Sequence, residues 1–236
     1  MGSQMHTTIG PAIEKPMDML HILERVNTND VLFLDEVHRL PPTVEELMYP
    51  VLEESRVDFL LNDKLFNCPL PKFTVVGATT MAGRLSAPFR NRFGLTARLE
   101  YYPPEDLAKI LVRSALILKV DIDAAGLLNI AKRARGTPRI ANTLLRRVRD
   151  FAGGRRVNGG MLTATFDLEG INEEGLGMLD QMYLACLRDK FKGGPAGVRA
   201  IASTMNESVD TLEEVVEGYL LYIGKIARTP RGRMLL

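Results

Sequence analysis

In Val31-Leu32-Phe33-Leu34-Asp35-Glu36, four apolar residues run directly into two carboxylates, and this pattern is the strongest indication of the fold class. A short, continuous apolar run is typical of a strand covered on both faces, as in a parallel sheet. Carboxylates at the carboxyl end of such a strand lie where open α/β sheets bind ligands. One of them can hold a metal ion through its waters while its neighbour orients water toward a phosphate. The alternative is a loop that starts with two solvated acids.

Helices and strands alternate on either side of this stretch. Apolar residues at helical spacing predict helices over residues 17–26 and 43–54, the second kinked or loosened by Pro50. A second buried strand is predicted at Phe73-Thr74-Val75-Val76 and a third at residues 95–99. This alternation predicts an α/β domain with a mainly parallel sheet.

Two short segments after the second strand are candidates for contact with a phosphate. Gly77-Ala78-Thr79-Thr80 would place two hydroxyls beside Asp35, although hydroxyls at strand ends are also common turn formers. Arg90-Asn91-Arg92-Phe93-Gly94 could present a guanidinium group to a phosphate held by a neighbouring subunit. The alternative for these arginines is an ordinary surface position.

Residues 104–170 show no strand signal and predict an all-α region with helices from Pro104, over 124–134 and over 138–151. The last of these begins with Thr137 as a suitable N-cap and Pro138 at the first helical position. Arg139 in the first turn opposes the helix dipole, so helix stability does not explain it. Together with the free amides of the helix start, Arg139 is a candidate anion site.

Residues 171–236 predict a winged helix, with helices over 178–189, 198–204 and 209–221 followed by a basic ribbon broken by glycine. The helix in the usual recognition position carries several acids, which a DNA major groove would repel. We therefore expect DNA binding without sequence reading, through phosphate contacts of the ribbon arginines Arg228, Arg231 and Arg233.

Composition excludes several classes of protein. The chain has 236 residues, a net charge of +1 and no apolar run of the ~20 residues that a bilayer requires. No leader peptide is recognisable, and the opening residues 1–6 read as a cloning remnant. Cys68 and Cys186 are too few for a disulfide framework or a metal box, so we expect a cytoplasmic protein. The basic cluster at residues 132–156 favours a polyanion partner, the alternative being a solvated helix face.

These motifs follow one another as in a known family. The stretches 31–40, 77–80, 91–94, 134–142 and 228–233 resemble, in order and spacing, those of the bacterial RuvB family. That family consists of hexameric AAA+ motors that drive branch migration of Holliday junctions with RuvA, in DNA recombination and repair. The resemblance extends from about Thr7 to Met234.

The resemblance implies a role for each matching residue. Asp35 and Glu36 resemble the Walker B pair for magnesium and water activation, and Thr79 or Thr80 resembles sensor 1. The remaining matches are an arginine finger, an adenine-packing tyrosine, a sensor 2 arginine and two DNA-contacting arginines: Arg92, Tyr102, Arg139, Arg228 and Arg233. The implied domains are a partial AAA+ ATPase domain (1–103), a small helical lid (104–170) and a winged helix (171–236).

Three departures from the family pattern limit these expectations. The sequence contains no Gly-x-x-x-x-Gly-Lys-Ser/Thr, which in the family lies upstream of the matching residues. We therefore expect this chain alone neither to bind ATP with Mg²⁺ tightly nor to hydrolyse it. The segment 57–71 is shorter than the hairpin with which the family contacts RuvA, and the chain stops soon after Arg233.

Two other functions remain open from the sequence. One is a non-catalytic DNA-binding or assembly module that keeps the lid and the winged helix. The other is a subunit of the clamp-loader type, against which the acidic helix and the Arg-Thr-Pro-Arg-Gly-Arg ribbon argue.

Overall fold

The computed structural model describes residues 2–61 and 64–236. It divides into two compact units, an N-terminal unit (residues 1–98) and a C-terminal unit (residues 99–236). No helix among the described residues is long and apolar enough to cross a membrane.

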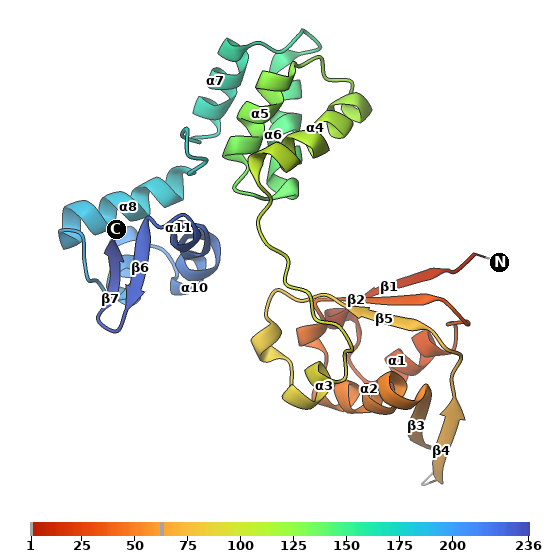
Figure 1. Ribbon diagram of the computed structural model, residues 1–236. Coiled ribbons are helices and arrows are strands. Elements are labelled where there is room, and N and C mark those ends of the chain that lie inside the picture. The colour runs from red at the N-terminus through yellow and green to blue at the C-terminus, as the bar shows by residue number, and fades with distance from the viewer. Residues whose placement is uncertain (1, 62–63) are drawn as a thin grey trace. The chain divides into compact units, whose positions relative to one another are not determined.

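The N-terminal unit is built on a three-stranded parallel sheet, in the order β1-β2-β5 (Figure 1). Its strands are β1 (Met5–Ile9), β2 (Val31–Asp35) and β5 (Thr74–Gly77). Ile9 lies opposite Asp35, and Leu34 lies opposite Gly77, so the three strands finish at one edge of the sheet. The predicted parallel sheet is confirmed.

The first residues of β1 correct one expectation. Met5 and His6, read from the sequence as part of a cloning remnant, pair with β2 in the sheet. His6 Nε2 lies 2.9 Å from Asp30 Oδ2, and the same carboxylate accepts the main-chain N–H groups of Gln4 and Asn27. These hydrogen bonds from Gln4, His6 and Asn27 lower the pKa of Asp30 to about 2.

One face of the sheet is covered by two helices. α1 (Pro16–Leu23) and α2 (Pro42–Glu54) share a core with Leu32 and Leu34. The prediction that β2 and β5 are covered on both faces is wrong, because Phe33 is only partly buried and Val76 is 40% exposed. A strand is buried on both sides only where helices lie on both faces of its sheet. In the described part of the chain, the core lies on the Leu32–Leu34 side.

The third strand predicted at residues 95–99 does not form. Leu95 is 84% exposed and Leu99 is 93% exposed, and the sheet ends at β5 in the described residues. Apolar spacing alone does not make a strand where no neighbouring strand offers hydrogen bonds. The chain passes here from the N-terminal to the C-terminal unit.

The remaining elements of the N-terminal unit follow α2, which runs through Pro50 and ends where Ser55 adopts the left-handed conformation. An antiparallel hairpin comes next, made of β3 (Arg56–Leu61) and β4 (Lys64–Pro69). It lies in the segment that the sequence marked as short, of which residues 62 and 63 are outside the described part. Four short helices complete the unit: η1 (Gly10–Ala12), η2 (Val37–Arg39), η3 (Ala82–Arg84) and α3 (Ala87–Asn91).

The C-terminal unit begins with a four-helix lid: α4 (Pro104–Leu118), α5 (Ala124–Arg133), α6 (Pro138–Ala152) and α7 (Gly159–Leu168). Its core is mainly aliphatic, with Leu111, Ile130 and Leu145 fully buried and Phe166 packed among them. α7 was not predicted from the sequence, because two glycines and two threonines obscure its helical pattern. In the structure Asn158 caps its first turn, and the hydroxyl of Thr165 donates to Met161 O at 2.7 Å.

The winged helix follows within the same unit. Its helical part comprises α8 (Met178–Phe191), α9 (Val198–Met205), α10 (Val209–Thr211), the π-helical segment η4 (Leu212–Glu217) and α11 (Gly218–Tyr222). The wing is the antiparallel pair β6 (Ile226–Thr229) and β7 (Gly232–Leu235), and Ala196 bridges to Arg233. Its core gathers around Tyr183, Leu187 and Leu212. The predicted succession of α/β domain, helical lid and winged helix is confirmed.

Candidate functional site

The carboxyl ends of β2 and β5 are tied together by a buried histidine. Glu36, at φ 49°, turns the chain away from β2, and its Oε2 lies 3.2 Å from His38 Nδ1. The same Nδ1 lies 2.9 Å from the hydroxyl of Thr79 at the end of β5, and Thr80 Oγ1 donates to Glu36 Oε2 at 3.4 Å. The His38 side chain is only 6% exposed. The structure therefore brings Glu36, Thr79 and Thr80 together next to Asp35, and the residue that joins them, His38, was not among the predicted site residues.

Asp35 ends β2 next to this cluster and is exposed. Its Oδ1 accepts the main-chain N–H of Glu36 at 2.9 Å. Among the described residues, no three His, Cys, Asp or Glu side chains gather as an all-protein metal site. A single exposed carboxylate fits Mg²⁺, because this ion is usually held by one or two carboxylates together with waters and substrate phosphates.

Arg92 does not extend freely into solvent. Its guanidinium group lies 4.1 Å from the centre of the Tyr49 ring, and its Nη1 donates to Pro88 O at 2.9 Å. Its Nε is 3.3 Å from Glu53 Oε1, a distance typical of an ion pair, yet the alignment does not make a hydrogen bond. The next residue, Phe93, packs on Gly77 at the tip of β5. Arg92 is thus anchored beside the strand tips but held against α2.

Tyr102 and Arg139 lie on adjoining segments of the C-terminal unit. The main-chain N–H of Tyr102 donates to Gly136 O at 2.8 Å, and Tyr102 is 47% exposed. Arg139 is exposed on the first turn of α6. Thr137 occupies the N-cap position as predicted, but its hydroxyl donates to Arg135 O instead of capping the helix. Asp35 and Thr80 belong to the other unit, so their convergence with Arg139 stays a prediction.

The wing arginines differ from one another. Arg228 and Arg233 both bind the carboxylate of Glu217, which is completely buried and also accepts the Tyr183 hydroxyl at 2.8 Å. Arg233 further pairs with Glu213, and its side chain is only 15% exposed. Arg228 is 47% exposed, and Arg231 is exposed at the turn between β6 and β7.

This arrangement limits the prediction that the acids of the helix 209–221 are available to repel a DNA major groove. Glu217 lies in the core, and Glu213 is neutralised by Arg233. Burial raises the pKa of Glu217, but the hydrogen bonds from Arg233, Tyr183 and Arg228 outweigh it and hold that pKa below its usual range. Burial and the Glu217 carboxylate raise the pKa of Tyr183.

Family models match three successive parts of the chain. Residues 1–99 match the Holliday junction DNA helicase RuvB P-loop domain, residues 102–164 the RuvB AAA lid domain, and residues 173–235 the RuvB C-terminal winged helix domain. The chain belongs to the RuvB family. This is the family of Holliday junction branch-migration motors.

Solved structures agree with membership in the RuvB family. The Thermotoga maritima RuvB Holliday junction branch migration motor is 41% identical, with a TM-score of 0.82 over 99% of this chain and 76% of that one. A point mutant of Thermotoga maritima RuvB is 40% identical, with a TM-score of 0.85 over 99% and 77%. NtrX from Brucella abortus with ADP is 13% identical, with a TM-score of 0.53 over 92% and 58%, and shares the fold alone.

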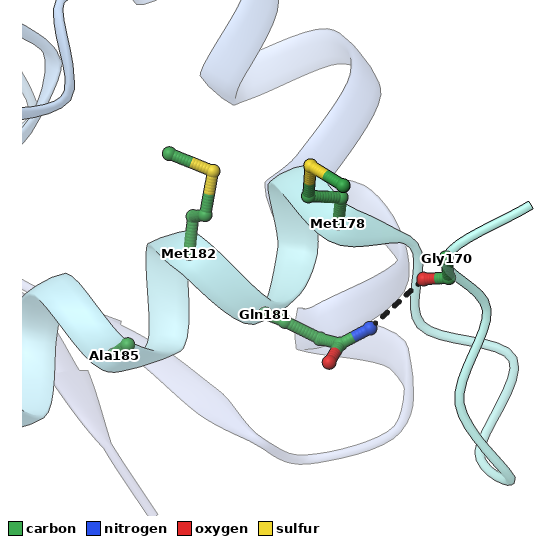
Figure 2. A pocket seen from close by; sticks show the side chains of 5 residues that line it. All are labelled: Gly170, Met178, Gln181, Met182 and Ala185. Atoms are coloured by element: carbon green, nitrogen blue, oxygen red, sulfur yellow. Dashed lines mark hydrogen bonds between the residues drawn. The ribbon is translucent and has the colours of Figure 1, made fainter. Parts of the chain in front are cut away.

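One hollow on this RuvB-family chain is lined by none of the proposed site residues. A pocket of about 390 Å³ lies on α8, and its lining residues are drawn in Figure 2: Gly170, Met178, Gln181, Met182 and Ala185. Gln181 donates to Gly170 O at 3.0 Å across its rim. None of the five lining residues has an ionisable side chain, so this hollow carries no acid–base or phosphate chemistry.

Proposed function

We propose that the chain supplies the water-activating, sensing and DNA-contacting residues of an ATP-driven motor that acts on Holliday junctions. The observation that carries the proposal is the cluster of Glu36, His38, Thr79 and Thr80 beside Asp35 at the carboxyl edge of the sheet. Phosphoryl transfer depends on positioning and on charge stabilisation more than on covalent chemistry. Side chains fixed at one edge by a buried hydrogen-bonded residue meet that requirement.

Each strand-tip residue has a role that its position supports. Asp35 would hold the magnesium ion that accompanies the nucleotide, an ion that would supply charge neutralisation at the phosphates when bound. Glu36 orients the attacking water. Thr79 and Thr80 respond to the terminal phosphate, because they contact both Glu36 and its partner His38.

Three arginine and tyrosine residues complete the nucleotide site. Arg92 leaves its contact with Tyr49 to reach the nucleotide of a neighbouring subunit in a hexameric ring. Tyr102 packs near the adenine, and Arg139 contacts the terminal phosphate. A planar guanidinium group suits both arginine roles because it binds phosphate oxygens in pairs.

This chain alone is expected neither to hold ATP tightly nor to hydrolyse it, because its sequence has no Gly-x-x-x-x-Gly-Lys-Ser/Thr. The test is a phosphate-release assay with ATP, Mg²⁺ and junction DNA. Turnover by the chain unaided would contradict the expectation.

DNA contact is proposed for the exposed side of the wing, with Arg228 and Arg231 on phosphates. Arg233 was predicted from the sequence to contact phosphates as well, but it is largely buried against Glu213 and Glu217, and we propose that it sets the orientation of the wing. Arg231→Ala should weaken binding to all sequences alike and lower the slope of log affinity against log salt by about one unit. Arg188→Ala removes the same charge from α8, where Arg188 pairs with Asp189, and is the matched control. An unchanged salt slope in Arg231→Ala would remove this residue from the interface.

The cell compartment proposed is the cytoplasm.

We propose that the partner RuvA contacts the β3–β4 hairpin. A pull-down of RuvA by the chain with and without the hairpin residues tests this contact. Sedimentation of the chain with DNA tests ring formation.

A further inference from the structure

The turn between α5 and α6 has an unusual main chain. Arg135 and Gly136 both adopt the left-handed conformation, at φ 52° and 65°. A side chain rarely occupies this region without a compensating contact, because Cβ then approaches the following carbonyl. Arg139, the proposed phosphate sensor, lies three residues further along the chain. The contacts of Arg135 therefore bear on the start of α6.

All polar contacts that the structure gives the Arg135 guanidinium group lead into the winged helix. Nη1 is 3.2 Å from Asp180 Oδ2 on α8, and Nη2 donates to Val215 O in the π-helical segment η4 at 3.4 Å. The group also lies 4.4 Å from the centre of the Tyr219 ring. The side chains of Arg135 and Asp180 are 18% and 4% exposed. A buried pair of this kind fixes one arrangement more than it adds stability, because desolvation offsets most of the attraction.

Tyr101 makes a second connection between the same turn and the same helix. Gly136 is so close to Tyr101 that a Cβ on Gly136 would lie 2.5 Å from Tyr101 Cβ. The Tyr101 ring packs on Tyr222 at 4.5 Å and on Tyr219 at 6.2 Å between ring centres. The next residue is Tyr102, proposed to face the adenine. Of these two adjacent tyrosines, Tyr101 contacts the winged helix and Tyr102 belongs to the proposed nucleotide site.

We propose that Arg135 is a positioning residue that locks the winged helix to the turn preceding Arg139, with Tyr101 as its aromatic partner. Lid and winged helix then move as one body, and a displacement of the 135–139 turn is carried to the wing. Transmission of a displacement from the turn to the wing rests on the proposed function, because it is the proposed function that has a nucleotide move the turn and places the wing on DNA. The lock itself needs neither ligand.

Arg133 provides a matched control within the same segment. Its guanidinium group lies 4.5 Å from the centre of the Phe166 ring and donates to Asn129, so its ring and its acceptor both belong to the lid. Arg133→Ala therefore removes a stacked, hydrogen-bonded arginine side chain whose contacts lie within the lid, and it leaves in place the Arg133 main chain, which lies beside Gly175 of the winged helix. Arg135→Ala removes the corresponding contacts between the lid and the winged helix.

The test is ¹⁵N relaxation on the full chain without nucleotide or DNA. In the unaltered chain and in Arg133→Ala, lid residues 104–168 and winged-helix residues 178–235 should share one rotational correlation time. In Arg135→Ala the winged helix should show a shorter correlation time than the lid, with the amide dispersion of each part retained. Arg135→Lys, which keeps the charge but not the planar fork, should restore common tumbling only in part.

A common correlation time in folded Arg135→Ala, or equal separation in Arg133→Ala, would overturn the proposal. Should Arg135→Ala fail to fold, Asp180→Asn and Tyr219→Leu approach the same contact from the winged helix and should give the same separation. The DNA affinity of each variant is measured in parallel. Loss of DNA binding in every variant, the unaltered chain included, would contradict the proposed function and leave the lock intact.

Discussion

Glu217 and Arg233 form an ion pair between the recognition-position helix and the wing, with Arg233 Nε 2.9 Å from a carboxylate that has no exposed surface. Arg228 binds the other oxygen of the same carboxylate. A buried carboxylate is tolerated only when charges and hydrogen bonds replace its water. Two arginines of the basic ribbon therefore stabilise the fold of the winged helix whether or not DNA is bound.

Replacing Glu217 by Gln should destabilise the winged helix by about 3 kcal/mol, because it leaves the largely buried Arg233 without its main counter-charge. Urea unfolding monitored by winged-helix amide signals measures the loss. Glu214→Gln is the control, because Glu214 is exposed on the same segment. Equal effects of the two variants would mean that the buried pair contributes nothing specific.

Stability of the winged helix should fall with acidification, and Glu217 should be responsible. A carboxyl whose pKa is lowered in the folded state stabilises it above the unfolded pKa, and this contribution is lost as pH falls through the folded pKa. Asp180 acts in the opposite direction, because burial raises its pKa despite Arg135. Urea midpoints from about pH 7 to about pH 3 should therefore fall, and fall less in Glu217→Gln. If the urea midpoint fell more steeply with acidification in Glu217→Gln than in the unaltered chain, Glu217 would not be the group that loses its stabilising effect at low pH.

Local sequence patterns predicted the strands β2 and β5 and most helices, because apolar spacing and caps act over a few residues. They failed for residues 95–99 and for the outer face of the sheet, where the outcome depends on which neighbours are present. Thr79, Thr80 and Glu36 could be selected from their places after two strands. His38 could not, because its role depends on a register between residues 41 positions apart.

In the wing, too, the burial of charged residues could not be predicted from local sequence patterns. From sequence, Glu217 and Arg233 count as two surface charges of opposite sign. Their burial follows from the neighbouring apolar positions Val216 and Leu220, which turn this side of the helix toward the core. A carboxylate beside such a stripe, facing a ribbon of arginines, is the signal that could have found the pair.

Gly136→Ala should disturb the contact between lid and winged helix more than its position suggests. The new Cβ is strained by the left-handed main chain at this position and also clashes with Tyr101. We therefore expect the free energy of unfolding to fall by about 3 kcal/mol and the amide signals of Tyr219 and Tyr222 to shift. Gly153→Ala is the matched control, because Gly153 also has a positive φ of 58° but no atom within 4 Å of its would-be Cβ. It should cost about 1 kcal/mol and leave the tyrosine signals in place. If the Tyr219 and Tyr222 signals did not shift in Gly136→Ala, the contact of Tyr101 with the winged helix would not depend on the turn.

Thr79→Val tests whether His38 joins the two strand tips. The hydroxyl of Thr79 contacts His38 Nδ1 and accepts the main-chain N–H of Met81 at 3.0 Å, so its removal should cost about 1–2 kcal/mol and change the His38 ring signals in NMR. Thr80→Val is the comparison, because Thr80 touches Glu36 only at 3.4 Å and does not reach the imidazole in the described structure. The His38 signals should therefore move far more in Thr79→Val. If both variants shift His38 equally, the imidazole responds to Glu36 alone, and the link between β2 and β5 is carried by the carboxylate.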